Sequence, residues 1–314
     1  EAMIVGTDPV LSVLAALPWR LLRPRTRIAH WCFDLYPEAA VAEGMVRDDA
    51  LPVRLLRRLL AAAYRRCDLL ADLGTCVRAR LARSGPTARR ARLTPWALVE
   101  PAAPPAPDPA TRRELFGEAR LALLYSGTFG RAHSCAEFLE LARQLRGDGA
   151  AFCFAGRGNR AEELRQQATA EDVNVRFAGF APEAELERRL AACDIHLVSL
   201  RPEWTGTVVP SKFFGALAAG RAVLFAGSPE SAIARWIEEH QVGRVLTEGT
   251  VLAVAQQLRA LAADPQGLAP LRERCHRVYH EWFSRERVLD AWDGQLRELV
   301  GADPPGLRRG LAGG

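Results

Sequence analysis

The chain has 314 residues, a formal net charge of +5 and a pI near 9.0, and 49% of its residues are hydrophobic. This length accommodates two domains of ordinary size, and the composition is typical of a soluble globular protein. No uncharged apolar run is long enough to span a membrane. The positive charge would suit an acidic partner, but no aromatic residues interleave with a basic stripe, so nucleic acid is not expected to bind.

The seven cysteines are odd in number, scattered and free of C-x-x-C spacing. They predict reduced core thiols in the cytoplasm rather than a disulfide framework or a zinc site. The chain begins at Glu1 with a strand-like stretch, MIVG, and lacks the basic preamble of a signal peptide. We expect the first domain to be N-terminally incomplete, because the chain begins as though a strand and a helix had preceded it.

Strands and helices alternate through the first 100 residues, which favours a parallel sheet covered by helices. Strands are expected at residues 3–6, 27–34 and 68–73, and helices at 8–20, 51–66 and after Thr75. Five prolines in residues 101–110 cannot continue either element, and they predict a semi-rigid linker. We therefore expect a first domain over residues 1–100, which the linker joins to a second domain over 111–282.

The second domain repeats the alternation six times, which predicts a doubly wound α/β sheet. Its strands are expected at 121–127, 150–156, 174–180, 194–200, 222–227 and 243–246, and its helices at 135–146, 160–169, 182–192, 211–219 and 230–239. Closing helices continue to about residue 300. The tail, residues 301–314, is rich in glycine and proline and is expected to be disordered.

One position carries the only lysine of the chain, since 41 of the 42 basic residues are arginines. Ligands of doubly wound sheets bind at the carboxyl ends of the strands. Lys212 follows the fourth strand of the second domain, directly after the helix-start residues Pro210 and Ser211. Exposed helix amides beside an ammonium form an anion site, so we interpret Lys212 as a phosphate-binding cation. The alternative is an ordinary surface lysine on an amphipathic helix.

Three further loops of the second domain end strands at the same edge. Gly127 and Gly130 bracket a turn that would let backbone amides approach a phosphate, although any tight turn uses glycine. Arg157 lies between two glycines after the second strand, either as a solvated side chain or as a ligand contact. Phe180 ends the third strand, where a nucleobase could lie against the main chain.

In the first domain, Asp34 and Glu38 end a strand and lie four residues apart. A carboxylate there could orient a sugar hydroxyl or move a proton, whereas His30, inside the apolar strand, is expected to be a core residue. Residues 10–27 and 51–66 combine leucines with arginine clusters. That combination is typical of a helix on an anionic membrane, and equally of a solvated face over the domain's own core.

Eight segments of the chain form a series: FDLYPE, TPWA, LLYSGTFGRAHS, FCFAGRGNR, VRFAGF, DIHLVSL, VVPSKFFGALAAGRAV and GRVL. In this order and at these spacings they resemble the retaining GT-B glycosyltransferases of family 4, in particular the bacterial branch that builds exopolysaccharide, O-antigen and colanic-acid-type repeats. The resemblance runs from about residue 1 to residue 300. It implies a GT-B fold of two Rossmann-like doubly wound domains, the first one partial, with helix 283–300 crossing back to the first domain.

The implied activity is transfer of a sugar, with retention, from a nucleotide diphosphate to a lipid-linked glycan acceptor in cell-surface polysaccharide synthesis. The resemblance implies no cofactor and no metal requirement. It places the protein in the cytoplasm, peripherally at the inner face of the plasma membrane.

The resemblance also implies roles for individual residues. Lys212 would neutralise the diphosphate and Asp34 would orient the acceptor or the sugar, as the catalytic residues. The donor-binding residues would be Gly127, Thr128, Arg131, His133, Arg157, Phe180, Glu203, Val208, Val209 and Ser211. Many members carry two glutamates whose places are held here by Thr207 and Gly215, and a histidine replaced by Phe33, which leaves the sugar and ribose contacts open.

Two alternatives also fit the series. A UDP-sugar 2-epimerase shares the architecture and the donor, but it calls for acid and base carboxylates around the sugar. A truncated, non-catalytic chain that binds a nucleotide sugar would have the same second domain.

Overall fold

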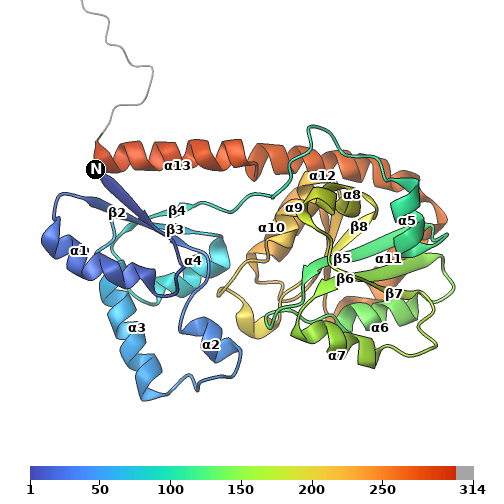
Figure 1. The fold of residues 1–314 in the computed structure, drawn as a ribbon, viewed down its shortest axis with the longest axis horizontal. Coiled ribbons are helices and arrows are strands. Elements are labelled where there is room, and N and C mark those ends of the chain that lie inside the picture. Colours follow the sequence, from blue (N-terminus) through green and yellow to red (C-terminus); the bar gives the residue numbers. More distant parts are fainter. Residues whose placement is uncertain (302–314) are drawn as a thin grey trace, which may run out of the picture. The chain divides into compact units, whose positions relative to one another are not determined.

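The structure is a computed structural model that describes residues 1–301 (Figure 1). These residues form two compact units, one made of residues 1–94 together with the chain from Glu286 onward, the other of residues 95–285. The proline-rich segment 101–110 belongs to the second unit, so the division between the units precedes it. The tail expected to be disordered, residues 301–314, lies outside the described residues except for Gly301.

The first unit is built on a four-stranded sheet in the order β1-β2-β3-β4, in which every neighbouring pair is parallel. Its elements are β1 (Ala2–Val5), a 3-10 turn (Ser12–Ala15), α1 (Ala16–Leu22), β2 (Arg27–Cys32), α2 (Glu38–Ala42), α3 (Leu51–Tyr64), β3 (Leu69–Asp72), α4 (Thr75–Ala82), β4 (Arg89–Arg92) and α13 (Arg285–Val300). Almost all of α13, the last described helix, therefore belongs to the unit that contains the start of the chain.

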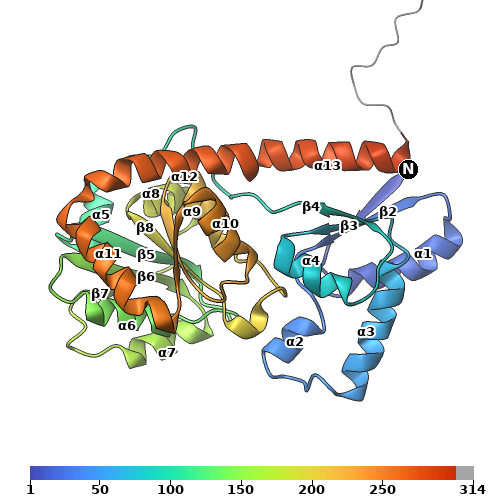
Figure 2. The same ribbon diagram turned by 180° about the vertical axis from the view of Figure 1, so that it is seen from behind.

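Two consecutive residues of β2 show how this sheet is covered on both faces. His30 stacks on Tyr64 of α3 with ring centroids 5.9 Å apart, and Trp31 meets Trp292 of α13 edge-on at 5.2 Å. Successive side chains of a strand point to opposite faces, so α3 and α13 cover opposite faces of the sheet (Figure 2). His30 is buried with Nδ1 2.8 Å from the carbonyl oxygen of Val5, as expected of a core histidine.

Two details of the first unit differ from the sequence-based expectation. The predicted helix 8–20 is wrong at its start, because Leu11 has a left-handed φ of 67° that a right-handed helix cannot contain, and α1 begins only at Ala16. Neither α2 nor β4 is foreseen by the sequence pattern. Strand β4 reads RRAR and has no apolar alternation, and it forms because its backbone pairs with β3 at the sheet edge, starting from Leu69 opposite Arg89.

The second unit contains a six-stranded parallel sheet in the order β10-β9-β8-β5-β6-β7, which confirms the predicted doubly wound sheet. Its strands are β5 (Leu121–Thr128), β6 (Ala150–Arg157), β7 (Val175–Ala178), β8 (Ile195–Ser199), β9 (Ala222–Ala226) and β10 (Gly243–Leu246). Its α-helices are α5 (Pro109–Phe116), α6 (Ala136–Gln144), α7 (Asn159–Gln167), α8 (Leu186–Ala191), α9 (Lys212–Ala218), α10 (Ala232–His240), α11 (Val251–Ala263) and α12 (Leu268–Trp282). The chain reverses the direction in which it adds strands between β5 and β8.

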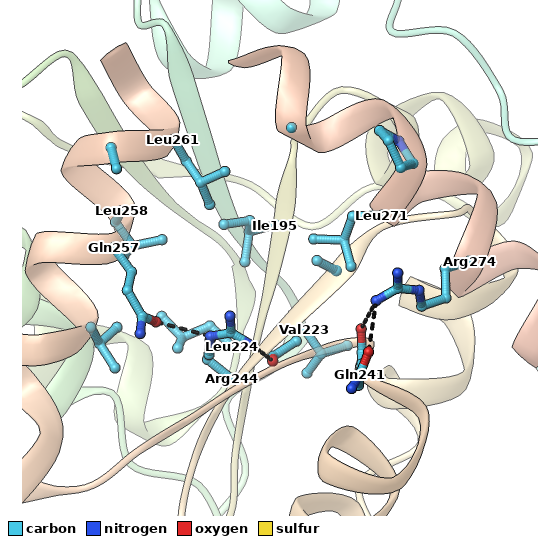
Figure 3. A pocket seen from close by; sticks show the side chains of 16 residues that line it. Ile195, Val223, Leu224, Gln241, Arg244, Gln257, Leu258, Leu261, Leu271 and Arg274 are labelled. Atoms are coloured by element: carbon cyan, nitrogen blue, oxygen red, sulfur yellow. Dashed lines mark hydrogen bonds between the residues drawn. The ribbon is translucent and has the colours of Figure 1, made fainter. Parts of the chain in front are cut away.

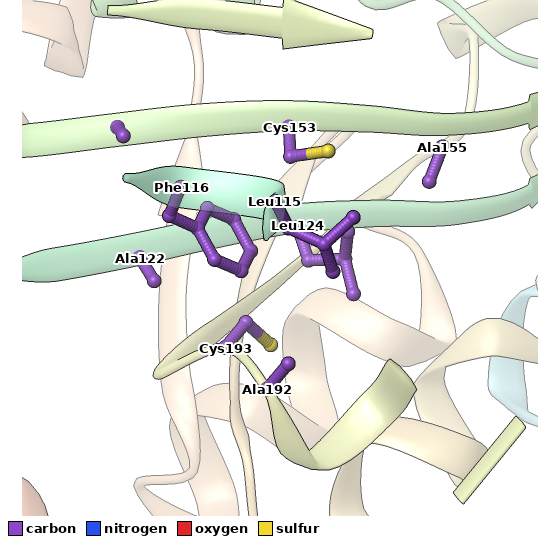
Figure 4. Close-up of a cluster of buried hydrophobic side chains, with 9 residues drawn as sticks. Leu115, Phe116, Ala122, Leu124, Cys153, Ala155, Ala192 and Cys193 are labelled. Carbon is purple, nitrogen blue, oxygen red and sulfur yellow. The ribbon is translucent and has the colours of Figure 1, made fainter. Parts of the chain in front are cut away.

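Small side chains on the central strands make room for a bulky helix end (Figure 4). Phe116 of α5 packs in a buried cluster with Ala122 and Leu124 of β5 and with Cys153 of β6. Burial raises the pKa of the Cys153 thiol to about 12, which keeps it protonated and unreactive. All seven cysteines are free and six are buried, in agreement with the core thiols expected from their spacing.

A buried carboxylate fastens the amino ends of β5 and β8. Asp194, 2% exposed, accepts hydrogen bonds from the Ala122 amide at 2.8 Å, from Arg112 of α5 at 2.8 Å and from Arg272 of α12 at 2.5 Å. Its own amide donates to the Ala122 carbonyl at 2.9 Å. One side chain therefore ties two strands and two helices together at the point where the strand order reverses.

We predict that Asp194→Ala lowers the free energy of unfolding of the second unit by about 3 kcal/mol or more, because it leaves two partly buried guanidinium groups and one amide without their acceptor. Urea unfolding followed by circular dichroism measures the loss. Asp293→Ala is the matched control, since it removes an exposed i, i+4 pair with Arg297 and should barely move the unfolding midpoint. Equal effects of the two substitutions would contradict the stabilising role of the Asp194 hydrogen bonds.

Candidate active site

The two central strands of the second sheet separate toward their carboxyl ends. Strand β5 pairs with β6 along its whole length, but among the described residues it pairs with β8 only at Leu123 and Leu124. The loop after β5 lies between the two strand ends. His133 Nδ1 lies 2.7 Å from the Ser199 carbonyl oxygen, and the Ala132 carbonyl accepts a hydrogen bond from the Arg201 amide at 2.9 Å. Ligands of doubly wound sheets bind in this crevice, at the reversal point of the strand order.

Glycines allow the backbones after β5 and β6 to touch. A Cβ on Gly156 would lie 1.8 Å from the carbonyl oxygen of Gly127, and a Cβ on Gly158 would lie 2.5 Å from that of Phe129. Gly127 itself has a φ of +127°, a conformation that other residues rarely adopt. These glycines therefore allow the ends of the two strands to pack closely against each other at this edge.

Lys212 lies over the end of β5, as its position after the fourth strand predicts. Its Nζ donates to the carbonyl oxygen of Thr128 at 3.1 Å and lies 5.0 Å from the centre of the Tyr125 ring. A Cβ on Gly127 would come within 2.9 Å of the lysine Cε, so this glycine makes room for the lysine stem. The ammonium is positioned by a carbonyl dipole and an aromatic face.

The ammonium of Lys212 carries an unbalanced charge. Within residues 1–301 no carboxylate lies in ion-pair distance of it, and burial lowers its pKa from 10.5 to about 8. A pKa near 8 leaves about nine-tenths of the side chains protonated at pH 7. A bound anion would supply the missing opposite charge.

His133 does not add a second charge beside Lys212. Burial, together with the neighbouring ammonium, lowers the pKa of His133 to about 4, against the effect of its bond to Ser199. The imidazole is therefore neutral at pH 7, and the structure assigns it to filling the gap between β5 and β8. Its ring meets Tyr125 edge-on at 6.2 Å.

A cavity of 480 Å³ opens beside Lys212 and lies within the second unit. Five of the residues predicted from the sequence line it: Gly127, Thr128, Phe180, Ser211 and Lys212. Phe180 is 48% exposed, and the guanidinium of Arg157 lies over its ring at 4.3 Å. The cavity thus has a cation at one part of its wall and an exposed aromatic ring at another.

The remaining predicted donor residues are not among those that line the cavity. These are Arg131, His133, Arg157, Glu203, Val208 and Val209, of which Arg157 reaches the cavity only through its contact with the Phe180 ring. Glu203 lies in a short 3-10 turn with its carboxylate 3.6 Å from Arg201, and Val209 is buried.

The hydroxyl of Ser211 does not cap α9, although serine is a common helix-start residue. Ser211 already has helical backbone angles, and its side chain accepts no bond from the helix amides. Its hydroxyl is left at the cavity wall.

Thr207 and Gly215, the positions where many relatives carry glutamates, differ in their surroundings. Thr207 is fully buried, whereas Gly215 lines the cavity. A Cβ on Gly215 would meet only Leu190, at an ordinary 3.6 Å. The cavity therefore has free space in front of this turn of α9.

Asp34 belongs to the first unit, where it lines a recess of about 10 Å³ with His30, Tyr36 and Tyr64. Desolvation, with a smaller contribution from the Asp8 carboxylate, raises the pKa of Asp34. A raised pKa favours the protonated form of this carboxyl group over that of a solvent-exposed aspartate. Glu38 pairs with Arg57 at 3.0 Å.

Several cavity residues are not foreseen by the sequence pattern. The segment 96–99, which follows the division between the units, returns to the cavity, and Tyr279 holds it by accepting the Ala97 amide at 2.9 Å. Glu183 is the only carboxylate among the described lining residues. It lies three residues after Phe180, so the loop that predicted a nucleobase contact also contained this acid.

A larger cavity of 620 Å³ lies elsewhere in the second unit (Figure 3). Arg244 bonded to Gln257 and Arg274 bonded to Gln241 flank its apolar floor. Its strand residues include the first residues of β8, β9 and β10, at the amino edge of the sheet. Because doubly wound sheets bind their ligands at the opposite edge, the candidate active site is the smaller cavity beside Lys212.

Comparison with known proteins finds related sequences. Residues 120–264 match the family described as glycosyl transferases group 1. The chain is 26% identical over 292 residues to the probable glycosyltransferase WbjE of Pseudomonas aeruginosa, a match that covers 91% of this chain and 70% of WbjE. The match to the family covers β5 through α11, which includes Lys212.

Solved structures share the fold at low sequence identity. HepE of Anabaena in complex with UDP superimposes with a TM-score of 0.70 at 13% identity, over 94% of this chain and 78% of HepE. Sucrose-phosphate synthase of Thermosynechococcus elongatus gives a TM-score of 0.68 at 16% identity, over 96% and 74% of the two chains. The fold is α/β with two Rossmann-like sheets, as in these GT-B enzymes. The group 1 match and the GT-B fold together support a GT-B glycosyltransferase of the group 1 type.

Proposed function

We propose that this chain is a family 4 glycosyltransferase that moves a sugar, with retention, from a nucleotide diphosphate to a lipid-linked glycan acceptor in bacterial cell-surface polysaccharide synthesis. One observation carries the proposal: the ammonium of Lys212, which has no carboxylate partner within residues 1–301, lies at the reversal point of a doubly wound sheet beside a 480 Å³ cavity. HepE, which shares the fold, has been crystallised with UDP and with UDP-glucose, which supports a uridine diphosphate sugar as the first donor to test.

In the proposed reaction, the bond between the sugar C1 and the diphosphate breaks while a bond from the acceptor oxygen to C1 forms on the same face, and the proton of the acceptor hydroxyl passes to the departing phosphate oxygen. Negative charge develops on the diphosphate as it leaves. Lys212, whose ammonium lies at the end of β5, would stabilise that charge. The nucleobase would lie against Phe180, with Arg157 stacked on the far side of the ring. This scheme uses no metal ion.

The acceptor side of the proposal rests on the first unit. Asp34, whose pKa is raised, would orient the acceptor hydroxyl or the sugar. Among residues 1–301, no helix combines the length and the apolar content that crossing a bilayer requires. We therefore propose that the protein reaches a lipid-linked acceptor from the cytoplasm, at the inner face of the plasma membrane.

Lys212→Met tests the central role. We expect it to lower turnover of a UDP-sugar about a hundredfold, the usual cost of losing one donor that stabilises a leaving group. Arg235→Met is the matched control, because it removes an exposed cation of the same unit away from the cavity. Turnover is measured as acceptor-dependent UDP release in the presence of EDTA. Unchanged turnover in Lys212→Met would end the proposal for this residue, and donor conversion without acceptor would identify an epimerase.

The lowered pKa of Lys212 predicts a pH dependence of donor binding. The side chain is cationic below its pKa of about 8 and becomes neutral as the pH rises through that value. A nucleotide diphosphate sugar keeps its own charge over this range, so its affinity should fall between pH 7 and pH 9. Titration calorimetry of the wild type and of Lys212→Met measures this. The variant should bind weakly with a flat profile, and a flat wild-type profile would contradict the assignment.

A steric pair tests the cavity without altering charge. Gly215→Ala should bind donor normally and be slightly more stable, since a Cβ fits there and alanine favours a helix over glycine. Gly215→Leu places a branched chain in the cavity and should weaken donor affinity at least tenfold. The donor-induced rise in melting temperature reports binding in both variants. Equal binding by the two would show that the donor lies elsewhere.

A further inference from the structure

The segment that begins the second unit is held to α12 at two successive points. At the first, the Ala97 amide donates to the Tyr279 hydroxyl at 2.9 Å, an ordinary hydrogen bond with one donor and one acceptor. At the second, the carbonyl oxygen of Pro101 lies 2.9 Å from His276 Nε2 and 3.3 Å from His280 Nε2. The two Nε2 atoms lie 3.0 Å from each other. Three polar atoms therefore converge on one point.

Hydrogen atoms cannot satisfy all three contacts at once. The Nε2 atom of a neutral imidazole carries either a hydrogen or a lone pair. If one Nε2 carries a hydrogen, the other nitrogen and the Pro101 oxygen still face each other with lone pairs. If both carry hydrogens, two N–H groups face each other at 3.0 Å. At least one contact is therefore repulsive in every neutral tautomer.

A cation bound by all three atoms would remove the repulsion. The ring centroids of His276 and His280 are 4.3 Å apart, farther than the Nε2 atoms, so the nitrogens point toward each other. A point about 2.1 Å from all three atoms, the length of a zinc–nitrogen bond, lies about 1 Å outside the plane that they define. Both rings are partly exposed, so water can complete the coordination.

The chemistry of the three atoms selects the kind of ion. Imidazole nitrogens bind zinc, copper and nickel, whereas magnesium and calcium prefer oxygen ligands. His276 and His280 are four residues apart on α12, a spacing that places both side chains on one face of a helix. Within residues 1–301 no three histidine, cysteine, aspartate or glutamate side chains gather as a metal site. The third protein ligand is therefore the main-chain carbonyl.

We propose that His276, His280 and the Pro101 carbonyl form a binding site for one zinc-type divalent ion, which fastens the segment 96–101 to α12. The ion takes no part in the transfer chemistry proposed above. Its effect on the molecule is structural: residues 96–99 line the candidate cavity, so the ion immobilises one part of the cavity wall.

Zinc binding by the full chain tests the site. The protein is freed of metal with EDTA, dialysed, and titrated with zinc chloride in competition with a chromophoric chelator. Wild type should bind one equivalent, which magnesium chloride should not displace. His276→Gln and His280→Gln should each bind zinc at least tenfold more weakly, because even the loss of a residue that only orients a metal ligand costs that much.

Two variants serve as matched controls. His240→Gln removes another partly exposed histidine of the same unit. Cys76→Ser removes the one cysteine of the seven that is not buried. Both should bind zinc as the wild type does.

Hydrogen exchange reports on the segment itself. Zinc should slow amide exchange in the peptide that covers residues 96–103 of the wild type, and the same zinc concentration should leave the two histidine variants unchanged. Without metal, both histidine variants should melt no lower than the wild type, because removing one ring relieves the repulsive contact. This second measurement also shows that each variant is folded.

Three results would overturn the proposal. The wild type could fail to bind one equivalent of zinc, or the histidine variants could bind it as the wild type does. Loss of binding in Cys76→Ser would assign the ion to a thiol. Metal-free histidine variants that melt several degrees below the wild type would show that the pair acts through hydrogen bonds instead. None of these measurements uses a sugar nucleotide, so their outcome is independent of the proposed function.

Discussion

The candidate site depends on how β5 and β8 are held at one end and parted at the other. Asp194 joins their amino ends to each other and to α5 and α12 through buried, charged hydrogen bonds. Beyond Leu124 the described residues of the two strands no longer pair with each other, and the loop after β5 bonds to the backbone at the end of β8 instead. The bonds of Asp194 hold β5 and β8 together at their amino ends while their carboxyl ends lie apart. The sheet stays intact there because β5 pairs with β6, and β8 with β9, along its whole length.

The side chains between the carboxyl ends of β5 and β8 determine the charge of the site. The loop after β5 inserts the imidazole of His133, which meets the ring of Tyr125 in β5 edge-on. The imidazole is neutral at pH 7, so neither ring adds a charge beside Lys212. Lys212 then reaches over the strand end through the space that Gly127 leaves. Burial lowers the pKa of Lys212, and no carboxylate within residues 1–301 lies close enough to raise it again. A bound anion would stabilise the protonated ammonium and would in turn be stabilised by it. The fold therefore holds a positive charge at the cavity without an opposite charge beside it.

Much of the second unit could be predicted from sequence, and the reasons are local. Its strands are short apolar runs bounded by glycine or polar turns, and β10 begins and ends where the pattern places it, at Gly243 and Leu246. Counting strands was enough to bring Lys212 to the correct edge. The first unit was harder, because β4 consists of three arginines and one alanine and exists only through pairing with its neighbour.

The parts of the site that sequence could not predict depend on distant contacts. Segment 96–99 reaches the cavity because Tyr279, far along the chain, fixes its backbone. The neutrality of His133 follows from burial, which no local pattern records. That the Ser211 hydroxyl makes no cap also could not be predicted locally, because it depends on the helical backbone angles that this residue adopts.

The rarity of lysine has a practical consequence for chemistry at this site. Lys212 is the single side-chain amine among 314 residues, and its lowered pKa makes the neutral, nucleophilic form more abundant than in an ordinary lysine. Acylating reagents that modify many positions in most proteins would find one lysine target here, at the mouth of the candidate cavity. Because the other 41 basic residues are arginines, which such reagents do not acylate readily, Lys212 can be labelled selectively.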